Sequence, residues 1–289
     1  MKIVILGAGG RLGAALMREY REKYEVAGFN HAQLDLARLD EVRAKLGATN
    51  FDVLLNAAGF TNVDACETAR DRAFLINAEV PGVLTQICRA KGARLIHFST
   101  DYVFGGEKRA PYTEEDQADP ISFYGESKLA GEKNVLAAEN GHLVVRVSWV
   151  FGPDRPSFID AMIRRAEQHE NIQAVSEKFS TPTYTHDVAR MLPQFFNRDE
   201  GGILHFANAG KCSWQEYAQW GLDCCREAGI PLKAGTVGAA KLSDMTNWVA
   251  RRPVYSVLST VKYTELTGTA PRAWREAVAD YITRFYSKK

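Results

Sequence analysis

The sequence carries almost no excess charge of either sign. Its 36 lysine and arginine residues offset 35 aspartate and glutamate residues, which leaves a formal net charge of +1 over 289 residues. Proteins that bind nucleic acid or anionic membranes through electrostatics need a strong positive field, and this balance does not supply one. We therefore expect neither a nucleic acid nor a membrane among the partners.

Long apolar runs are also missing. No stretch reaches the roughly 18 apolar residues of a membrane-spanning helix. Residues 1–6 lead directly into a glycine-rich segment and lack the cleavage region of a secretory signal. These two absences predict a cytoplasmic protein.

Cysteine is scarce, and its spacing excludes two further classes of site. The five cysteines do not follow the spacing of metal ligands, and their odd number does not suit a disulfide framework. We expect free thiols, buried or incidental, with the adjacent Cys224 and Cys225 on a helix, and we predict no metal site. The remaining composition, 46% hydrophobic and 25% charged, is that of a globular protein with room for a sizeable core.

A glycine pattern follows the first apolar run. Residues 2–6 are typical of a strand buried on both faces, and residues 14–20 have a helical pattern. Between them, Gly7, Gly10 and Gly13 permit a tight turn, close approach of the backbone to a pyrophosphate, and close packing of helix on strand. The helix N-terminus then offers N–H groups and a positive dipole end to phosphates. The segment predicts a dinucleotide site.

The second strand, expected over residues 24–29, lacks the acidic residue that binds the ribose 2′-hydroxyl of NAD. It leads into Asn30, which favours NADPH, with NADH as an alternative cofactor. Arg11 is either a ligand of the 2′-phosphate or a solvated loop residue. Asp35 either accepts a hydrogen bond from the adenine amino group or caps a helix that runs through Leu46.

Strands alternate with helices up to about residue 150. We expect strands at 51–55, 94–98 and 142–147, and helices at 71–91 and 124–138. Pro81 must kink the first of these helices or start a new one. The alternation predicts an α/β fold, a Rossmann-type doubly wound parallel sheet. Ligands in such folds bind beyond the carboxyl ends of the strands, where residues 57–59, Thr100 and Trp149 follow.

The second half of the chain has a looser pattern. We predict two domains, a dinucleotide-binding Rossmann domain over residues 1–150 and a smaller α/β substrate-binding lobe over residues 151–289, interleaved with the first. The elements expected in the lobe are helices at 158–169, 186–196, 214–227 and 271–286, strands at 172–175 and 202–207, and a loop at 245–256.

A hydroxyl at a strand end and a Tyr-x-x-x-Lys pair on a helix suit carbonyl reduction. Tyr124 and Lys128 lie one helical turn apart and face the same way. A nearby ammonium lowers the pKa of a phenol, so Tyr124 can donate a proton while carbon receives hydride, and Thr100 can hold the carbonyl oxygen. We interpret three histidines as core residues without a catalytic part: His97, His186 and His205.

Seven motifs, in this order, resemble those of the extended short-chain dehydrogenase/reductases, and within them the dTDP-4-dehydrorhamnose reductases. The resemblance covers nearly the whole chain, and Ser-Thr-Asp-Tyr-Val-Phe over residues 99–104 is its most specific motif. The other motifs are GAGGRLG (7–13), LDL (34–36), NAAGFTNVD (56–64), YGESK (124–128), RVSWVFG (146–152) and RPVYSVL (252–258).

The motifs and this resemblance imply three sets of site residues. The catalytic set is Thr100, Tyr124 and Lys128. The cofactor set is Gly7, Gly10, Arg11, Leu12, Gly13, Asn30, Asp35, Leu36, Ala57, Ala58, Gly59, Tyr124 and Lys128. The substrate set is Val63, Tyr102 and Trp149 at the sugar and Arg252 at the nucleotide part, where it would pair with the pyrophosphate.

The resemblance implies NAD(P)H-dependent reduction of the C4 ketone of a nucleotide-linked deoxysugar, dTDP-4-dehydrorhamnose to dTDP-L-rhamnose, by a monomer or homodimer. Two alternatives stay open: an epimerase or dehydratase of the same superfamily, and a non-catalytic dinucleotide-binding regulatory subunit. The chain departs from the family at Lys178 and Ser180, where Gln and Gly are usual, and at Ser157, where Asn is frequent. These departures leave the nucleotide and the sugar open.

Overall fold

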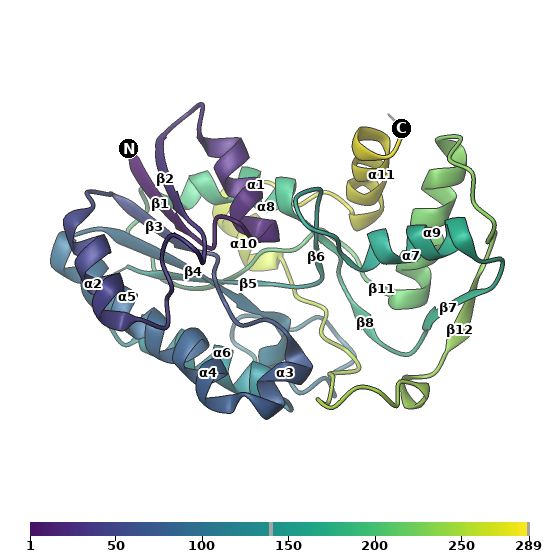
Figure 1. Ribbon diagram of the computed structural model, residues 1–289, viewed down its shortest axis with the longest axis horizontal. Coiled ribbons are helices and arrows are strands. Elements are labelled where there is room, and N and C mark those ends of the chain that lie inside the picture. The colour runs from purple at the N-terminus through teal and green to yellow at the C-terminus, as the bar shows by residue number, and fades with distance from the viewer. Residues whose placement is uncertain (139–140, 288–289) are drawn as a thin grey trace.

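A six-stranded parallel sheet forms the larger part of the molecule (Figure 1). The structure, a computed structural model, describes residues 1–138 and 141–287. Neighbouring strands run parallel in the order β10–β5–β4–β3–β1–β2. The strands are β1 (Lys2–Leu6), β2 (Glu25–Phe29), β3 (Val53–Asn56), β4 (Arg94–Thr100), β5 (Leu143–Val147) and β10 (Gly202–His205). The prediction of a Rossmann-type doubly wound α/β fold is confirmed.

Helices cover both faces of the sheet because successive strand side chains point to opposite sides. In β1, Ile3 and Ile5 enter one apolar core, and Val4 and Leu6 enter the other. The first core lies under α1 (Arg11–Tyr20), α8 (Thr185–Met191), η3 (Leu192–Phe195) and α10 (Val261–Thr267). The second lies under α2 (Leu39–Ala48), α5 (Val80–Lys91) and α6 (Phe123–Leu136).

The helix expected over residues 71–91 is divided into three segments. They are α4 (Arg70–Phe74), the π-helical η1 (Leu75–Glu79) and α5 (Val80–Lys91), preceded by α3 (Val63–Thr68). Pro81 stands in the first turn of α5, directly after the π-helical segment, and the backbone at Glu79 and Val80 is right-handed helical. The helix is thus divided into segments next to Pro81, while a kink at this residue stays a prediction.

The second half of the chain builds a smaller lobe beside the sheet (Figure 1). Its helices are α7 (Phe158–Gln168), α9 (Trp214–Glu227) and α11 (Trp274–Phe285), and its strands include β7 (Ile172–Val175) and β12 (Val237–Ala240). The chain nevertheless returns to the sheet, because β10, α8 and α10 also follow residue 151. The division at residue 150 stays a prediction.

Several short elements were not expected from the sequence. They are β6 (Val150–Phe151), β8 (Phe179–Ser180), β9 (Thr183–Tyr184), β11 (Cys212–Ser213), η2 (Asp101–Val103) and η4 (Leu242–Asp244). Segments of two or three residues are too short to show a hydrophobic period. In contrast, α9 begins at Trp214 and ends at Glu227 as predicted, and the Ser213 side chain caps it by accepting a hydrogen bond from Glu216 N.

Two expectations about apolar segments and thiols can be compared with the described residues. In residues 1–138 and 141–287, no helix combines the length and the apolar character needed to cross a membrane. All five cysteines are free and buried, and Cys224 and Cys225 lie on α9, as predicted.

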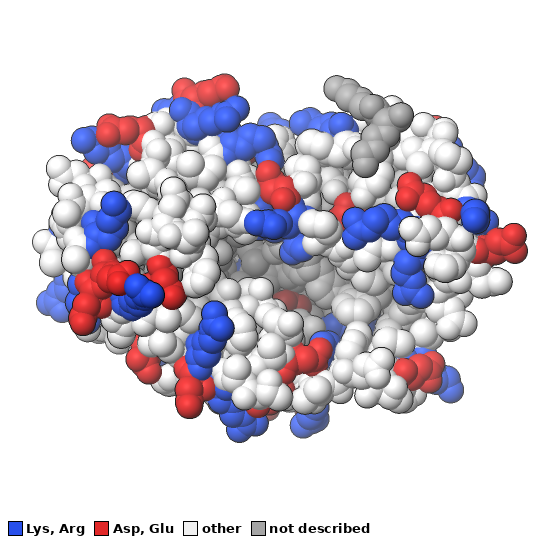
Figure 2. Space-filling model, in the orientation of Figure 1, with Lys and Arg blue, Asp and Glu red and all other residues white. Residues whose placement is uncertain are grey.

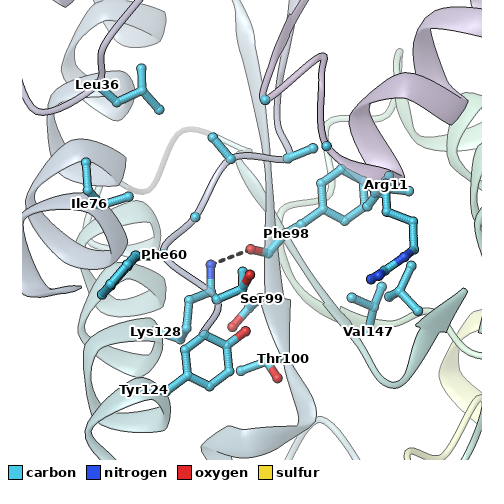
Figure 3. Close-up of a pocket in the computed structure, with 18 of the residues that line it drawn as sticks. Arg11, Leu36, Phe60, Ile76, Phe98, Ser99, Thr100, Tyr124, Lys128 and Val147 are labelled. Atoms are coloured by element: carbon cyan, nitrogen blue, oxygen red, sulfur yellow. Dashed lines mark hydrogen bonds between the residues drawn. The ribbon is translucent and has the colours of Figure 1, made fainter. Parts of the chain in front are cut away.

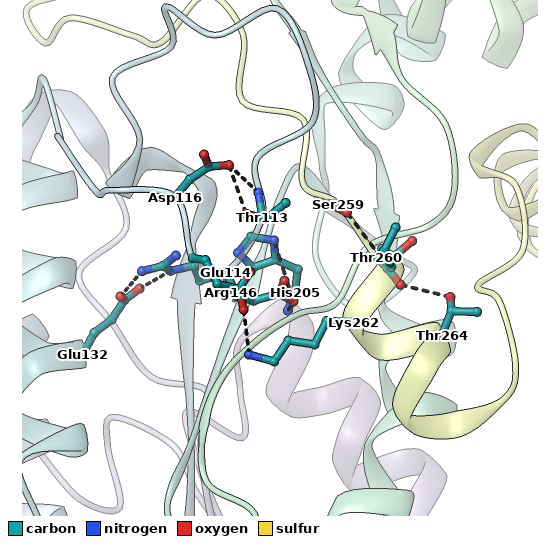
Figure 4. Close-up of polar contacts among 12 residues, drawn as sticks. Thr113, Glu114, Asp116, Glu132, Arg146, His205, Ser259, Thr260, Lys262 and Thr264 are labelled. Carbon is teal, nitrogen blue, oxygen red and sulfur yellow. Dashed lines mark hydrogen bonds and ion pairs between the residues drawn. The ribbon is translucent and has the colours of Figure 1, made fainter.

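A buried ion pair fixes α6 to the sheet. Arg146 in β5 and Glu132 in α6 have side chains that are 3% and 1% exposed. Nε and Nη2 of the arginine donate to the two carboxylate oxygens at 2.9 and 2.6 Å, and the hydroxyl of Ser99 donates to the same carboxylate. Figure 4 shows the pair beside a second buried contact, in which Glu114 accepts from the backbone N–H of His205.

We expect Arg146→Met to lower the free energy of unfolding by about 3–5 kcal/mol, because it leaves the buried Glu132 carboxylate without its cationic partner and with only the Ser99 hydroxyl as a side-chain donor. Urea-induced unfolding at neutral pH measures this change. The double variant Arg146→Met/Glu132→Leu removes both charges and should recover most of the loss. A single variant as stable as the parent protein would contradict this account of the pair.

Candidate active site

A cavity of about 580 Å³ opens beyond the carboxyl ends of the strands. Figure 2 shows a hollow near the middle of this face, with charges of both signs spread around it. Most of the predicted site residues line the cavity: Gly7, Gly10, Arg11, Leu12, Asn30, Asp35, Leu36, Ala57, Ala58, Gly59, Val63, Thr100, Tyr102, Tyr124, Lys128 and Trp149. Gly13 and Arg252 are not among the lining residues.

The glycine loop between β1 and α1 leaves no room for side chains. Gly7 has φ of +73°, and a Cβ there would lie 2.8 Å from Ala58 N. A Cβ on Gly13 would lie 2.1 Å from Gly7 O. Gly10 begins α1 without a side-chain cap, and the first turn of α1 contains no acidic residue. The loop therefore fits a dinucleotide, because unblocked N–H groups and the positive end of the helix dipole face the cavity.

The end of β2 carries polar side chains without a carboxylate at the position expected for NAD. The Asn30 side chain accepts from Gln33 N at 3.1 Å, and the Gln33 side chain accepts from Asn30 N at 3.0 Å. Asp35 accepts from Ala37 N at 3.0 Å and lines the cavity. The alternative that Asp35 caps the next helix is wrong, since α2 begins at Leu39 after this turn.

Arg11 connects the glycine loop to the lobe. Its Nε donates to Arg155 O at 3.2 Å and its Nη2 donates to Pro156 O. Arg155 in return donates to Gly9 O at 3.0 Å. The guanidinium is thus neither a solvated loop group nor free, and a contact of Arg11 with a 2′-phosphate stays a prediction.

Thr100, Tyr124 and Lys128 lie together at the carboxyl end of β4. Figure 3 shows Tyr124 and Lys128 projecting from α6 toward this strand end, with Thr100 beside the phenol and Arg11 across the cavity. The Thr100 hydroxyl accepts from Tyr102 N and donates to the Asp101 carboxylate, each at 3.2 Å. Helix α6 starts at Phe123 because the Ser122 side chain caps it by accepting from Gly125 N. The sequence spacing thus brings all three side chains to one point.

The effect of Lys128 on the pKa of Tyr124 differs from what the sequence predicted. Burial raises the pKa of the Tyr124 phenol, and a hydrogen bond with Thr100 opposes the increase. We expected Lys128 to lower this pKa, but the causes of the shift do not include its ammonium, and its Nζ donates to Phe98 O at 2.7 Å. Burial also lowers the pKa of Lys128 to about 8, although the Glu132 carboxylate favours the charged form.

Tyr102 and Trp149 form the wall that faces the lobe. The Tyr102 ring meets the Tyr124 ring edge-on, with centroids 5.7 Å apart. Trp149 follows β5 with φ of 39°, a left-handed conformation that costs a non-glycine residue energy and is found at functional sites. Lys178, which is 0% exposed, places Nζ 5.0 Å from the Tyr102 ring and 5.8 Å from the Trp149 ring, and it donates to Pro253 O.

Arg252 is held by an ion pair outside the cavity. Its two terminal nitrogens donate to the Asp64 carboxylate at 3.1 and 2.6 Å, and its guanidinium lies 4.2 Å from the centre of the Trp248 ring. Asp64 also accepts from Val249 N and Ala250 N at 2.9 Å. These contacts anchor the loop at 245–256 to α3. The predicted contact of Arg252 with a pyrophosphate remains a prediction.

Two polar residues of the site were missed or left open by the sequence interpretation. His97, taken as a core histidine, lies with Nε2 3.3 Å from Lys128 Nζ. Asn77, in the π-helical segment, holds the backbone of Phe60 at 2.9 and 3.0 Å and donates to Ser127 Oγ at 3.0 Å. The signal for Asn77 was an asparagine four residues before Pro81 in a helical pattern, but no local pattern indicated His97.

The fold and this arrangement define the class of protein: a Rossmann-type dinucleotide-binding protein with the Thr–Tyr–Lys set of the extended short-chain dehydrogenase/reductases. Its family follows from a model described as the RmlD substrate binding domain, which matches residues 1–287. The chain belongs to this family.

Known proteins resemble the chain over nearly its whole length. It is 39% identical over 285 residues to dTDP-4-dehydrorhamnose reductase of Mycolicibacterium smegmatis, covering 97% of this chain and 85% of that protein. It is 37% identical to a probable dTDP-4,6-dihydroxy-2-methyloxan-3-one 4-ketoreductase of Streptomyces antibioticus, covering 97% and 94%. The crystal structure of dTDP-4-dehydrorhamnose reductase from Bacillus anthracis in complex with NADP is 29% identical, with a TM-score of 0.90 and coverage of 98% and 99%.

We expect Gly13→Ala to weaken dinucleotide binding by at least about tenfold, because the added methyl group must push α1 away from the turn at Gly7. Titration with NADPH, followed by fluorescence, measures the affinity. Gly47→Ala is the matched control, since a Cβ at Gly47 meets nothing within 4 Å. Equal NADPH affinity in both variants would argue against binding at this turn.

Proposed function

We propose that the protein is an NADPH-dependent oxidoreductase that reduces the C4 ketone of dTDP-4-dehydrorhamnose to give dTDP-L-rhamnose. One observation carries the proposal: Thr100, Tyr124 and Lys128 line the same cavity as the glycine loop. Relatives that bear this activity in their names and match the chain from end to end support it. A cytoplasmic location and a nucleotide-sugar ligand are parts of the same proposal, as is a monomeric or homodimeric state.

The residues of the glycine loop and of the first three strand ends would hold the cofactor. Backbone N–H groups at the start of α1 would bind the pyrophosphate, and residues 57–59 offer a small-residue surface against which the cofactor can lie. Asn30 and Leu36 would border the adenosine part. When bound, the nicotinamide supplies the hydride.

The chain's own part in the reduction is to supply and steer a proton. Tyr124 Oη would donate to the ketone oxygen as that oxygen gains negative charge, and the Thr100 hydroxyl would orient the same oxygen. Lys128, in its charged form, would favour the phenolate that Tyr124 becomes. Because the pKa of Tyr124 is raised in this structure, the approach of the Lys128 ammonium to the phenol is what would make proton transfer efficient.

Tyr102 and Trp149 would form the surface for the sugar ring, with Val63 at its edge. The relative from Streptomyces antibioticus is named for a 4-ketoreductase of a different dTDP-linked sugar, and we infer that selectivity for the sugar depends on residues outside the catalytic set. Lys178 and Ser180, which differ from the family pattern, lie directly behind this wall. Ser180 donates to the Asp101 carboxylate at 3.2 Å, next to Thr100.

A panel of 4-keto nucleotide sugars mixed with NADPH or NADH, followed by absorbance at the nicotinamide band, tests the proposal. We expect stoichiometric NADPH consumption with dTDP-4-dehydrorhamnose. An epimerase would show no net consumption, and a dehydratase would not need added NADPH. If no 4-keto nucleotide sugar is reduced, the proposed function is wrong.

We expect Tyr124→Phe to lower kcat by about 10²–10⁴-fold, which is the contribution typical of a positioned general acid, while NADPH still binds. Steady-state kinetics and a cofactor titration measure the two effects. Tyr263→Phe is the matched control, because Tyr263 is a buried tyrosine on α10 away from the cavity. Near-normal turnover in Tyr124→Phe would contradict the assignment.

We expect kcat/KM to fall as pH rises through about 8. The pKa of Lys128 is lowered to about 8 by burial, so its ammonium is present below this pH and is lost above it. Initial rates between pH 6 and 10 give the profile. Lys128→Arg should be slower but should lose this alkaline limb, because a guanidinium stays charged over the whole range. A parent profile that is flat to pH 10 would exclude Lys128 as the titrating group.

A further inference from the structure

His97 occupies a position between two side chains that no local sequence pattern connects. It lies in the middle of β4 with 0% exposure. Its Nδ1 is 2.9 Å from Asn56 Nδ2 at the end of β3, and its Nε2 is 3.3 Å from Lys128 Nζ on α6. Its neighbours in β4, Ile96 and Phe98, are apolar core residues. Both polar contacts of the buried imidazole are thus made to residues at the active site.

We propose that His97 is a positioning residue for the reduction, which accepts a hydrogen bond from Lys128 and thereby holds this lysine in its charged form. The proposal rests on the proposed function of the same site. It assigns His97 no contact with substrate or cofactor. The imidazole would act through Lys128, and Asn56 would act through the imidazole.

The number of protons on Lys128 and on the imidazole explains why His97 favours the charged lysine. A lysine ammonium has three N–H donors and no lone pair, so Nε2 must accept when Lys128 is charged. The ring is then neutral with its proton on Nδ1, and burial together with the nearby Lys128 charge holds the His97 pKa well below its usual range. The Nδ1 proton requires an acceptor, which the carboxamide oxygen of Asn56 would provide once the amide turns over, because in this structure Nδ2 faces Nδ1 and the oxygen accepts from Ala58 N.

The opposite pairing accompanies a neutral lysine. When Nδ2 of Asn56 donates to Nδ1, as the contact is arranged here, the ring proton sits on Nε2 and Nζ must accept it as a neutral amine. The orientation of the Asn56 amide, the tautomer of His97 and the charge of Lys128 therefore change together. The Asn56 side chain also accepts from Ala58 N at 3.3 Å. This contact connects the series Asn56–His97–Lys128 to the cavity wall.

The other groups around Lys128 define its electrostatic surroundings. From α6 itself, the Glu132 carboxylate favours the ammonium, and Tyr124 lies one turn before Lys128. From β5, Arg146 neutralises much of that carboxylate by its bidentate pair. From β4, Phe98 contributes a carbonyl and His97 contributes the imidazole. His97 is therefore the titratable side chain of the strand that directly contacts Nζ.

Two substitutions of His97 distinguish the loss of the hydrogen-bond acceptor for Lys128 from the loss of the imidazole ring itself. His97→Gln places an amide near the former Nε2 and can still accept from Lys128. His97→Asn places its amide near the former Nδ1 and reaches Asn56 but not Lys128. We expect the alkaline limb of kcat/KM to stay near its parent position in His97→Gln and to move about one pH unit lower in His97→Asn, which corresponds to about 1.4 kcal/mol. Above pH 8 the Asn variant would then be up to about tenfold slower than the Gln variant.

Thermal unfolding and NADPH affinity at pH 6.5 accompany both profiles. A structural role would lower the rate in both variants equally at every pH, and this result would overturn the proposal, as would equal positions of the two alkaline limbs.

If a variant does not fold, ¹⁵N NMR of the histidine ring in the parent protein provides the second measurement. We expect the protonated ring nitrogen of His97 to change from Nδ1 to Nε2 as pH rises through about 8.

The NMR measurement uses neither substrate nor turnover. It therefore separates a failure of this proposal from a failure of the proposed function. A tautomer that stays constant from pH 6.5 to 9.5 would overturn the coupling of His97 to the Lys128 charge, whatever reaction the protein catalyses.

Discussion

An ammonium group taken out of water needs an acceptor for each of its protons, and much of the arrangement around β4 follows from this requirement. Lys128 is buried, and its Nζ finds the carbonyl of Phe98 and the ring of His97. The compensating carboxylate of Glu132 is itself buried and needs Arg146 and Ser99. One buried charge thus accounts for a polar network that reaches from α6 through β4 to β5.

The same requirement explains why the phenol and the lysine do not yet interact as a carbonyl reductase needs. Burial raises the pKa of Tyr124 and lowers that of Lys128, so each group is stabilised in its neutral form. The lysine makes two polar contacts on the strand, and the tyrosine is hydrogen bonded to Thr100. A bound ligand that offers acceptors on the cavity side could draw Nζ toward the phenol, because the strand-side contacts are two and the ammonium has three protons.

Local chemistry made the glycine loop, the sheet and the grouping of Thr100, Tyr124 and Lys128 predictable. Gly7 and Gly13 stand where a side chain would collide with backbone, and such a constraint is visible within a few residues of sequence. Continuous apolar runs such as that of β1 identify buried strands for the same reason. Asp35 was predicted less well, because a turn and a helix cap use the same residue type, and only the path of the chain distinguishes them.

Contacts between residues far apart in the chain were not predictable. His97 is 31 residues from Lys128 and 41 from Asn56, and Arg252 is 188 residues from Asp64. Each pair depends on how the sheet and the lobe come together, which no local pattern records. The two-residue strands of the lobe were not predicted for a related reason. Their pairing partners define them, and their own sequences do not.

The return of the chain to the sheet has a consequence for how selectivity can change in this architecture. Strand β10 pairs with β5, and α8 supplies core residues such as Val188 that pack with Leu16 of α1. A chain ended after residue 150 would leave the β5 edge unpaired and would remove α8, η3 and α10 from the face of the sheet that they cover together with α1. The lobe is therefore not a module that can be exchanged whole. Under the proposed function, new sugar preferences would come from single replacements in the wall behind Tyr102 and Trp149, where Lys178 lies.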